Sequence, residues 1–193
     1  MEITNLQKAI DSFTTAITEL YKEKKHVIIA IDGPSGAGKS TFAEHLSILF
    51  KGNIIHVDDF FLQLHQRTQE RLDTPGGNFD RERLLKEVIL PAKNKSDFSY
   101  RPYDCKKGEL LTPVNIQDKP ITFIEGVYSC HPKLWDYYDY RIFIKIDKET
   151  QFKRLEERNP KLLERFISEW IPLEDKYFST FNIPNKCDLI VEI

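Results

Sequence analysis

The chain has 193 residues, with 28 Lys and Arg against 30 Asp and Glu, so its formal net charge is −2. Hydrophobic residues make up 40% and charged residues 30%, which is ordinary for a globular protein and excludes disorder as the global state. A nearly neutral chain has no general electrostatic attraction to nucleic acid or anionic membranes, so we expect neither as a partner. The length predicts one domain with room for a small insert.

The cysteines and the N-terminal segment indicate in which cellular compartment the protein is expected. Cys105, Cys130 and Cys187 are far apart and lack metal-ligand spacing, so they predict neither a disulfide framework nor a zinc site and favour a reducing compartment. The N-terminal sequence MEITNLQKAI does not resemble a signal peptide, and the longest aliphatic run, residues 27–31, is too short to cross a bilayer. We therefore expect a cytoplasmic protein.

Hydrophobic periodicity predicts the elements. Apolar residues at steps of three and four over residues 5–21 predict an amphipathic helix within an N-terminal extension, residues 1–25. This helix would pack on the core or contact a second subunit, so a homo-oligomer is left open. The chain then predicts, in order, strand 27–31, helix 39–50, strand 54–57, helix 81–90, strand 121–124, strand 141–146, helix 148–158, helix 161–181 and strand 188–193.

The alternation of strands and helices predicts an α/β fold, with a central parallel sheet of about five strands flanked by helices. Asp80 is the expected N-cap of helix 81–90, and Pro91 is expected to stop that helix. Residues 96–117 depart from the alternation. Their two extended runs around Lys106-Lys107-Gly108 predict a hairpin insert, which could cover a pocket or lie on the surface.

Residues 33–40, GPSGAGKS, match the P-loop pattern G-x-x-x-x-G-K-[ST] between a predicted strand and a predicted helix. In this motif glycines let the backbone wrap around phosphate, Lys39 neutralises the β and γ phosphates, and the Ser40 hydroxyl binds Mg²⁺. The motif predicts a three-layer P-loop NTPase fold that binds ATP or GTP with Mg²⁺. The expected nucleotide contacts are Gly33, Pro34, Ser35, Gly36, Ala37, Gly38, Lys39, Ser40 and Thr41.

Acidic residues follow two of the predicted strands. Asp58-Asp59 ends the second strand, and Glu125-Gly126 ends the third. Ligands bind at the C-terminal ends of strands in open α/β sheets, where an acid can hold Mg²⁺ or accept the proton of a hydroxyl. Each Asp taken alone favours ordinary turn chemistry, but two acidic strand ends beside a P-loop favour a catalytic site.

Several segments resemble uridine kinase and its phosphoribulokinase relatives over roughly residues 26–193. They are the P-loop, Asp58-Asp59-Phe60-Phe61, Asn78-Phe79-Asp80, Arg101-Pro102-Tyr103-Asp104, Glu125-Gly126 and the helix that carries Arg154 and Arg158. The resemblance implies one kinase domain over residues 26–193, with the hairpin insert at 96–117 and a helical lid region at 148–181.

The same resemblance implies roles for single residues. Asp58 would lie beside the acceptor hydroxyl and near the metal, and Glu125 would be a second metal-side acid. Asp80, Tyr103 and Arg101 would contact the acceptor, and Arg154 and Arg158 would close over the phosphates. Two positions depart from the family pattern: Gly108 replaces a base-contacting His, and Gln151 replaces a first lid Arg.

The sequence thus predicts a P-loop kinase that transfers the γ-phosphoryl group of ATP to a hydroxyl of a small molecule, with a nucleoside such as uridine or cytidine as the leading acceptor. Two alternatives stay open. One is a kinase for another hydroxyl metabolite: a sugar, a vitamin precursor or a phosphosugar. The other is a regulatory module that uses the nucleotide as a conformational signal.

Overall fold

A six-stranded parallel sheet forms the centre of the protein. The computed structural model describes residues 2–3 and 6–192 of the chain. The strand order across the sheet is β1 (Glu2–Ile3), β10 (Leu189–Glu192), β9 (Tyr140–Lys145), β2 (Val27–Asp32), β8 (Ile121–Glu125) and β3 (Asn53–His56). Five of these strands are the expected ones. The sixth, β1, was not expected, because two residues are too short to carry a periodic pattern.

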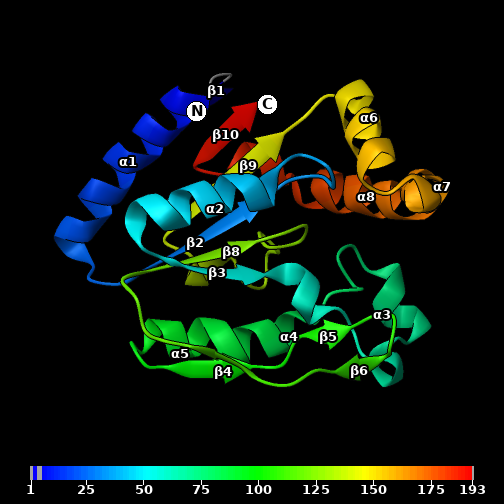
Figure 1. Cartoon of the computed structure of the whole chain (residues 1–193), viewed down its shortest axis with the longest axis horizontal. Helices are drawn as coiled ribbons and strands as arrows, with labels where there is room; N and C mark the ends of the chain where they lie inside the picture. Colours follow the sequence, from blue (N-terminus) through cyan, green and yellow to red (C-terminus); the bar gives the residue numbers. More distant parts are fainter. Residues whose placement is uncertain (1, 4–5, 193) are drawn as a thin grey trace.

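Helices cover both faces of the sheet, as Figure 1 shows, which confirms the three-layer α/β prediction. On one face lie α1 (Leu6–Glu23) and α2 (Lys39–Phe50). Phe13 and Ile17 of α1 are buried in the same cluster as Ile29 of β2 and Phe123 of β8, so the N-terminal helix packs on the sheet. The strands β2 and β8 are buried on both faces, which explains their continuous apolar sequences.

The opposite face is covered by helical segments from two parts of the chain. One runs through α4 (Arg81–Leu84), a π-helical turn over residues 85–89, and α5 (Leu90–Lys93). The other comprises α8 (Ile171–Phe181) and α9 (Ile183–Lys186). The segment for which a lid is predicted begins with α6 (Lys148–Arg158), followed by a 3₁₀ turn over residues 160–162, α7 (Leu163–Arg165) and a π-helical turn over residues 166–170.

The prediction that Pro91 stops its helix is wrong. The helix continues to Lys93, because the π-helical turn before Pro91 changes the hydrogen-bond register: the Leu90 amide donates to the Leu85 carbonyl, five residues earlier. The wider turn accommodates a residue that has no amide hydrogen and whose ring would clash with the preceding turn of a regular α-helix. Pro172 follows a π-helical turn in the same way, where the Ile171 amide donates to the Phe166 carbonyl.

The hairpin insert forms as expected, as two short antiparallel ladders. The outer arms are β4 (Phe98–Tyr100) and β7 (Val114–Ile116), and the tip is formed by β5 (Tyr103–Asp104) and β6 (Glu109–Leu110). It lies beside the segment that follows β3, which contains 3₁₀ turns over residues 57–60 and 64–66 and the helix α3 (Gln69–Asp73) (Figure 1). The sequence predicted none of these short turns.

A buried carboxylate at the end of β2 joins three separate segments. Asp32 has no exposed surface, and its oxygens accept hydrogen bonds from the amides of Gly33 (2.8 Å), Tyr128 (3.2 Å) and Cys130 (2.9 Å) and from the Tyr177 hydroxyl (2.9 Å). Burial raises the pKa of Asp32 to about 6, and the hydrogen bonds from Cys130, Gly33 and Tyr177 oppose that rise. The carboxylate is therefore ionised at neutral pH, and it holds the loops after β2 and β8 against α8.

Within the described part of the chain, no helix is both long and apolar enough to cross a membrane.

We expect Asp32→Asn to lower the free energy of unfolding by about 1–3 kcal/mol or more, because an amide group in this place turns a donor towards other donors and leaves a buried group unpaired. Urea unfolding followed by circular dichroism measures the loss. Asp136→Asn, at an exposed position of the 3₁₀ turn over residues 135–137, is the matched control and should change stability by less than about 0.5 kcal/mol. Equal stability of the two variants would contradict the anchoring role of Asp32.

Candidate functional site

The loop between β2 and α2 owes its path to glycines. Gly33 has φ +145°, and a Cβ atom there would lie 2.3 Å from the carbonyl oxygen of Ile144 on β9. Gly38 has φ +87°, a left-handed conformation that L residues with side chains rarely adopt. Only glycine lets the chain pass this close to the sheet and then turn directly into a helix.

The same loop presents unpaired backbone donors. Among the residues that the structure describes, nothing accepts a hydrogen bond from the amides of Gly36, Gly38, Lys39 or Ser40. The Lys39 side chain is buried, and its Nζ donates to the carbonyl of Pro34 at 3.0 Å, so the ammonium group is held inside the loop. Converging amides, a buried ammonium and the N-terminus of α2 form a site suited to a polyphosphate.

Two adjoining cavities surround this loop. The smaller, of about 110 Å³, is lined by Ser35, Gly36, Gly38, Lys39, Ser40, Thr41, Asp58, Glu125, Gly126, Val127 and Arg158. The larger, of about 390 Å³, is lined by Gly36, Gly38, Thr41, Phe42, His45, Arg154, Leu155 and Arg158. The fold thus brings together the P-loop, the acids Asp58 and Glu125, and the two arginines expected in the lid, from four regions of the sequence.

The carboxylate of Glu125 contacts two other side chains on the acidic side of the smaller cavity. Its Oε1 accepts a hydrogen bond from Ser40 Oγ at 3.1 Å and lies 2.5 Å from His56 Nδ1. The hydrogen bond with Glu125 raises the pKa of His56, although partial burial opposes the rise. The Ser40 hydroxyl and the Glu125 carboxylate are therefore close enough to bind the same cation, and both supply oxygen ligands, which Mg²⁺ prefers.

The two neighbouring aspartates after β3 have different surroundings. The Asp58 side chain lines the smaller cavity. Loss of hydration beside the protein raises its pKa, while the charge of Lys39 lowers it. Asp59 instead accepts a hydrogen bond from the Tyr100 hydroxyl at 2.8 Å and ties the hairpin insert to the segment after β3. Asp58 is the residue of the pair that faces the P-loop.

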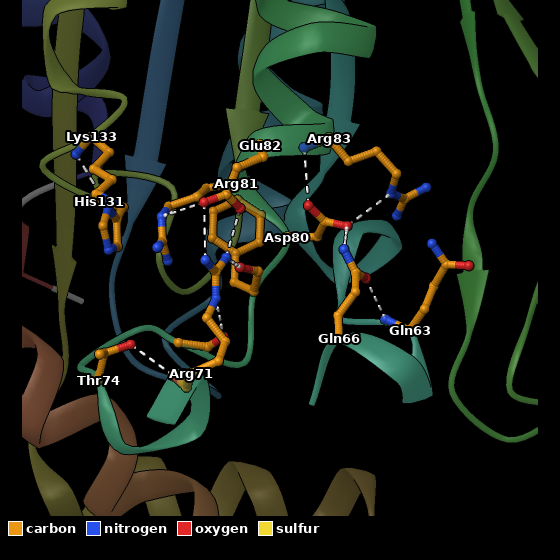
Figure 2. A network of polar contacts seen from close by, with 12 residues as sticks. Gln63, Gln66, Arg71, Thr74, Asp80, Arg81, Glu82, Arg83, His131 and Lys133 are labelled. Carbon is orange, nitrogen blue, oxygen red and sulfur yellow. Dashed lines mark hydrogen bonds and ion pairs between the residues drawn. The ribbon is translucent and has the colours of Figure 1, made fainter. Parts of the chain in front are cut away.

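Asp80 lies in a polar network, drawn in Figure 2, and its two oxygens already have partners there. It is 3% exposed, and Oδ1 accepts from the Arg83 amide at 3.0 Å, so the predicted N-cap is confirmed. Oδ2 accepts from Gln66 Nε2 at 2.8 Å and lies 3.8 Å from Arg83 Nε. Asp80 is not among the residues that line either cavity.

The two hairpin residues named as acceptor contacts also lie outside both cavities. The Arg101 guanidinium donates to the carbonyls of Leu110 and Leu111, each at 2.6 Å, so it bridges the arms of the hairpin. The Tyr103 side chain is 4% exposed, and its hydroxyl has no hydrogen-bond partner in the described residues. The Arg67 guanidinium lies 5.9 Å from the centre of the Tyr103 ring.

The predicted lid region contacts the P-loop through residues for which the sequence predicted no such contact. Gln151, at the position of the expected first lid arginine, is buried, and its Nε2 donates to the Ser35 carbonyl at 2.8 Å. Glu174 of α8 accepts from the Ser35 amide and hydroxyl. Among the lid arginines, Arg154 Nη1 approaches the Gly36 carbonyl at 3.5 Å. No sequence signal marked Glu174, because its partner lies 139 residues away.

Comparison with known proteins agrees with this geometry. The sequence matches the profile of the phosphoribulokinase / uridine kinase family over residues 28–161, well over half of the chain. A uridine kinase from Ureaplasma parvum serovar 3 is 24% identical over 184 residues, covering 88% of this chain and 88% of that protein. A phosphoribulokinase from a Synechocystis species is 27% identical over 133 residues, which are 65% of this chain and 39% of that protein.

Among solved structures, a protein from Bacillus stearothermophilus described as a possible uridine kinase has a TM-score of 0.71 and 21% identity, covering 96% of this chain and 98% of that one. At this identity the likeness supports the fold alone. Together, the profile match, the P-loop and the parallel sheet lead to one assignment. The chain belongs to the phosphoribulokinase / uridine kinase family, a family of ATP-dependent kinases.

Proposed function

We propose that this kinase transfers the γ-phosphoryl group of ATP to a hydroxyl group of a small molecule, and that the acceptor is a nucleoside such as uridine or cytidine. The observation that carries the proposal is the shared cavity in which Asp58 lies beside Lys39, Ser40 and Glu125. A carboxylate that faces the phosphate-binding loop is suited to the approach of a hydroxyl nucleophile to a terminal phosphate. The uridine kinase and phosphoribulokinase relatives share this class of reaction by name.

The phosphate-binding residues supply positioning and charge. The free amides of the P-loop bind the phosphate oxygens, and Lys39 neutralises part of their charge. Ser40, Glu125 and Asp58 are the residues that would hold Mg²⁺, since their oxygens line one cavity. When bound, Mg²⁺ supplies further neutralisation of the phosphate charge. Most of the acceleration then comes from orientation and electrostatic stabilisation, because the transition state needs little covalent help.

Asp58 is the proposed base. Its carboxylate orients the attacking hydroxyl and takes the proton as the new P–O bond forms and the bond to ADP breaks. Nearby protein atoms limit the hydration of its carboxylate and raise its pKa, which increases its affinity for that proton. Arg154 and Arg158 line the cavity around the P-loop from α6, and we assign them the stabilisation of negative charge on the transferring group.

The acceptor is the least constrained element of the proposal. Asp80, Tyr103 and Arg101 remain candidate acceptor contacts, and the first would need to exchange a partner such as Gln66 to bind sugar hydroxyls. Gly108, with φ +72°, forms the tip of the hairpin where uridine kinases are expected to carry a base-contacting His. This difference favours, as a second candidate, a kinase of the same mechanism for another hydroxyl metabolite, such as a sugar or a phosphosugar.

An acceptor screen tests the proposal. Purified protein with saturating Mg-ATP is offered nucleosides, sugars, phosphosugars and vitamin precursors, and ADP release is followed with a coupled assay. We expect uridine or cytidine to raise ADP release at least about tenfold above the hydrolytic background, because binding an acceptor converts a slow reaction with water into an oriented one. Stimulation by a sugar alone would select the second candidate. No stimulation by any hydroxyl compound would contradict the kinase assignment of this site.

The Lys39→Ala variant should lose about 10²-fold or more in kcat/KM and bind Mg-ATP more weakly, because the lost ammonium contacts phosphate in both the ground state and the transition state. Steady-state kinetics and calorimetric titration measure the two effects. Lys86→Ala, at an exposed position on the helix that covers the other face of the sheet, should behave as wild type. An unchanged affinity and rate in Lys39→Ala would refute the P-loop role.

Asp58→Asn should reduce kcat by about 10²–10⁴-fold and leave the Kd of Mg-ADP within about threefold, because the amide keeps the shape of the carboxylate and an oxygen for Mg²⁺ but accepts no proton. The matched control is Asp59→Asn, which removes the charge of Asp59 but keeps Asp58 and an oxygen that can accept from the Tyr100 hydroxyl. Its kcat should fall by much less. If the two variants lose the same activity, or if Asp58→Asn turns over normally, Asp58 is not the base.

A further inference from the structure

The P-loop residue Ser35 is held by the lid region through every polar group that it has. Its amide donates to Glu174 Oε2 at 2.9 Å, and its hydroxyl donates to Glu174 Oε1 at 2.5 Å. Its carbonyl accepts from Gln151 Nε2 at 2.8 Å. Glu174 belongs to α8 and Gln151 to α6, so two helices that lie close together at this end of the molecule share one residue of the phosphate-binding loop (Figure 1).

Glu174 is an unexpected residue in this place. Its side chain is 3% exposed, and none of the described lysines or arginines forms an ion pair with it. Burial raises its pKa, while its hydrogen bonds with Ser35 and the charge of Lys39 lower it. A buried carboxylate next to a polyphosphate site costs free energy through both desolvation and repulsion, so packing alone would favour an apolar residue here.

The Ser35 amide differs from the other P-loop amides. The amides of Gly36, Gly38, Lys39 and Ser40 have no acceptor among the described residues, but the Ser35 amide already has one. Glu174 therefore leaves the anion-binding amides free and holds only the residue that precedes them. A side chain that fixes Ser35 also limits the backbone conformations of the next residue, Gly36, which by itself is flexible.

We propose that Glu174 is a positioning residue for nucleotide binding, which acts through Ser35 to keep the P-loop in its binding conformation. It contacts no substrate itself. This role depends on the length of the side chain, which lets its carboxylate accept two hydrogen bonds from one residue, and not on its negative charge. Because α6 carries both Gln151 and the arginines Arg154 and Arg158, the same contacts hold the lid helix next to the loop. This inference rests on the proposed binding of a nucleoside triphosphate by the P-loop.

Three substitutions separate reach from charge. Glu174→Gln keeps the length and loses the charge, Glu174→Asp keeps the charge and loses one methylene of length, and Glu174→Ala loses both. The Kd of Mg-ADP, measured by calorimetry without an acceptor, should stay within about threefold of wild type for Glu174→Gln, because the new amide oxygen can accept from the Ser35 amide and the Ser35 hydroxyl can turn to accept from the new NH2 group. It should rise about tenfold for Glu174→Asp and at least that much for Glu174→Ala, because the Ser35 donors are left unpaired. Asp175→Asn, one residue further on and paired with Lys148 at the surface, is the control.

The outcomes distinguish this inference from the proposed function. If Glu174→Ala does not fold, the pair of Glu174→Gln and Glu174→Asp carries the test. Wild-type affinity in Glu174→Asp and Glu174→Ala would overturn the inference, even if their melting temperatures fall, because that result describes packing alone. A Glu174→Gln variant as weak as Glu174→Asp would overturn it as well. If wild-type protein binds Mg-ADP but phosphorylates no acceptor, that result contradicts only the proposed kinase reaction. If wild-type protein does not bind Mg-ADP, both proposals are overturned.

Discussion

Four hydrogen bonds to one buried carboxylate hold the candidate site together. Asp32 ends the central strand β2, and its oxygens accept from the first residue of the P-loop, from the loop after β8 and from Tyr177 of α8. Each of these segments alone is a surface loop or a helix that could shift. Because a buried carboxylate must keep its donors, the three are constrained to one arrangement. The position of Glu125 relative to Ser40 depends on this arrangement.

The helices α6 and α8 add a second set of contacts around the same loop. Tyr177 and Glu174 lie one turn apart on α8 and contact Asp32 and Ser35, so one face of this helix holds the P-loop at two points. Gln151 and Arg154 contact the loop from α6. The phosphate-binding loop is thus supported by side chains from outside its own strand and helix. Such support is what a preorganised anion site needs, since glycine-rich backbone is flexible by itself.

Local signals predicted much of the fold. Five of the six sheet strands, the helix after the P-loop, the hairpin and the N-cap at Asp80 follow from periodicity and capping chemistry within short windows. The prediction for Pro91 was wrong for an equally local reason: a π-helical turn, which no residue pattern announces, accommodates the proline. The strand β1 was missed because its two residues take their conformation from pairing with β10.

The sequence by itself determined the phosphate-binding loop, since the glycines, Lys39 and Ser40 act through their own backbone and neighbours. It also indicated that Asp58 and Glu125 follow the C-terminal ends of two strands, where ligands bind in open α/β sheets. The structure showed that these two strands are neighbours. Only the tertiary structure decided which aspartate faces that loop. It also showed that the Arg101 guanidinium donates hydrogen bonds within the hairpin. It alone revealed Asp32 and Glu174 as supports. Their partners lie up to 145 residues away, and a carboxylate's role depends on donors that only packing brings to it.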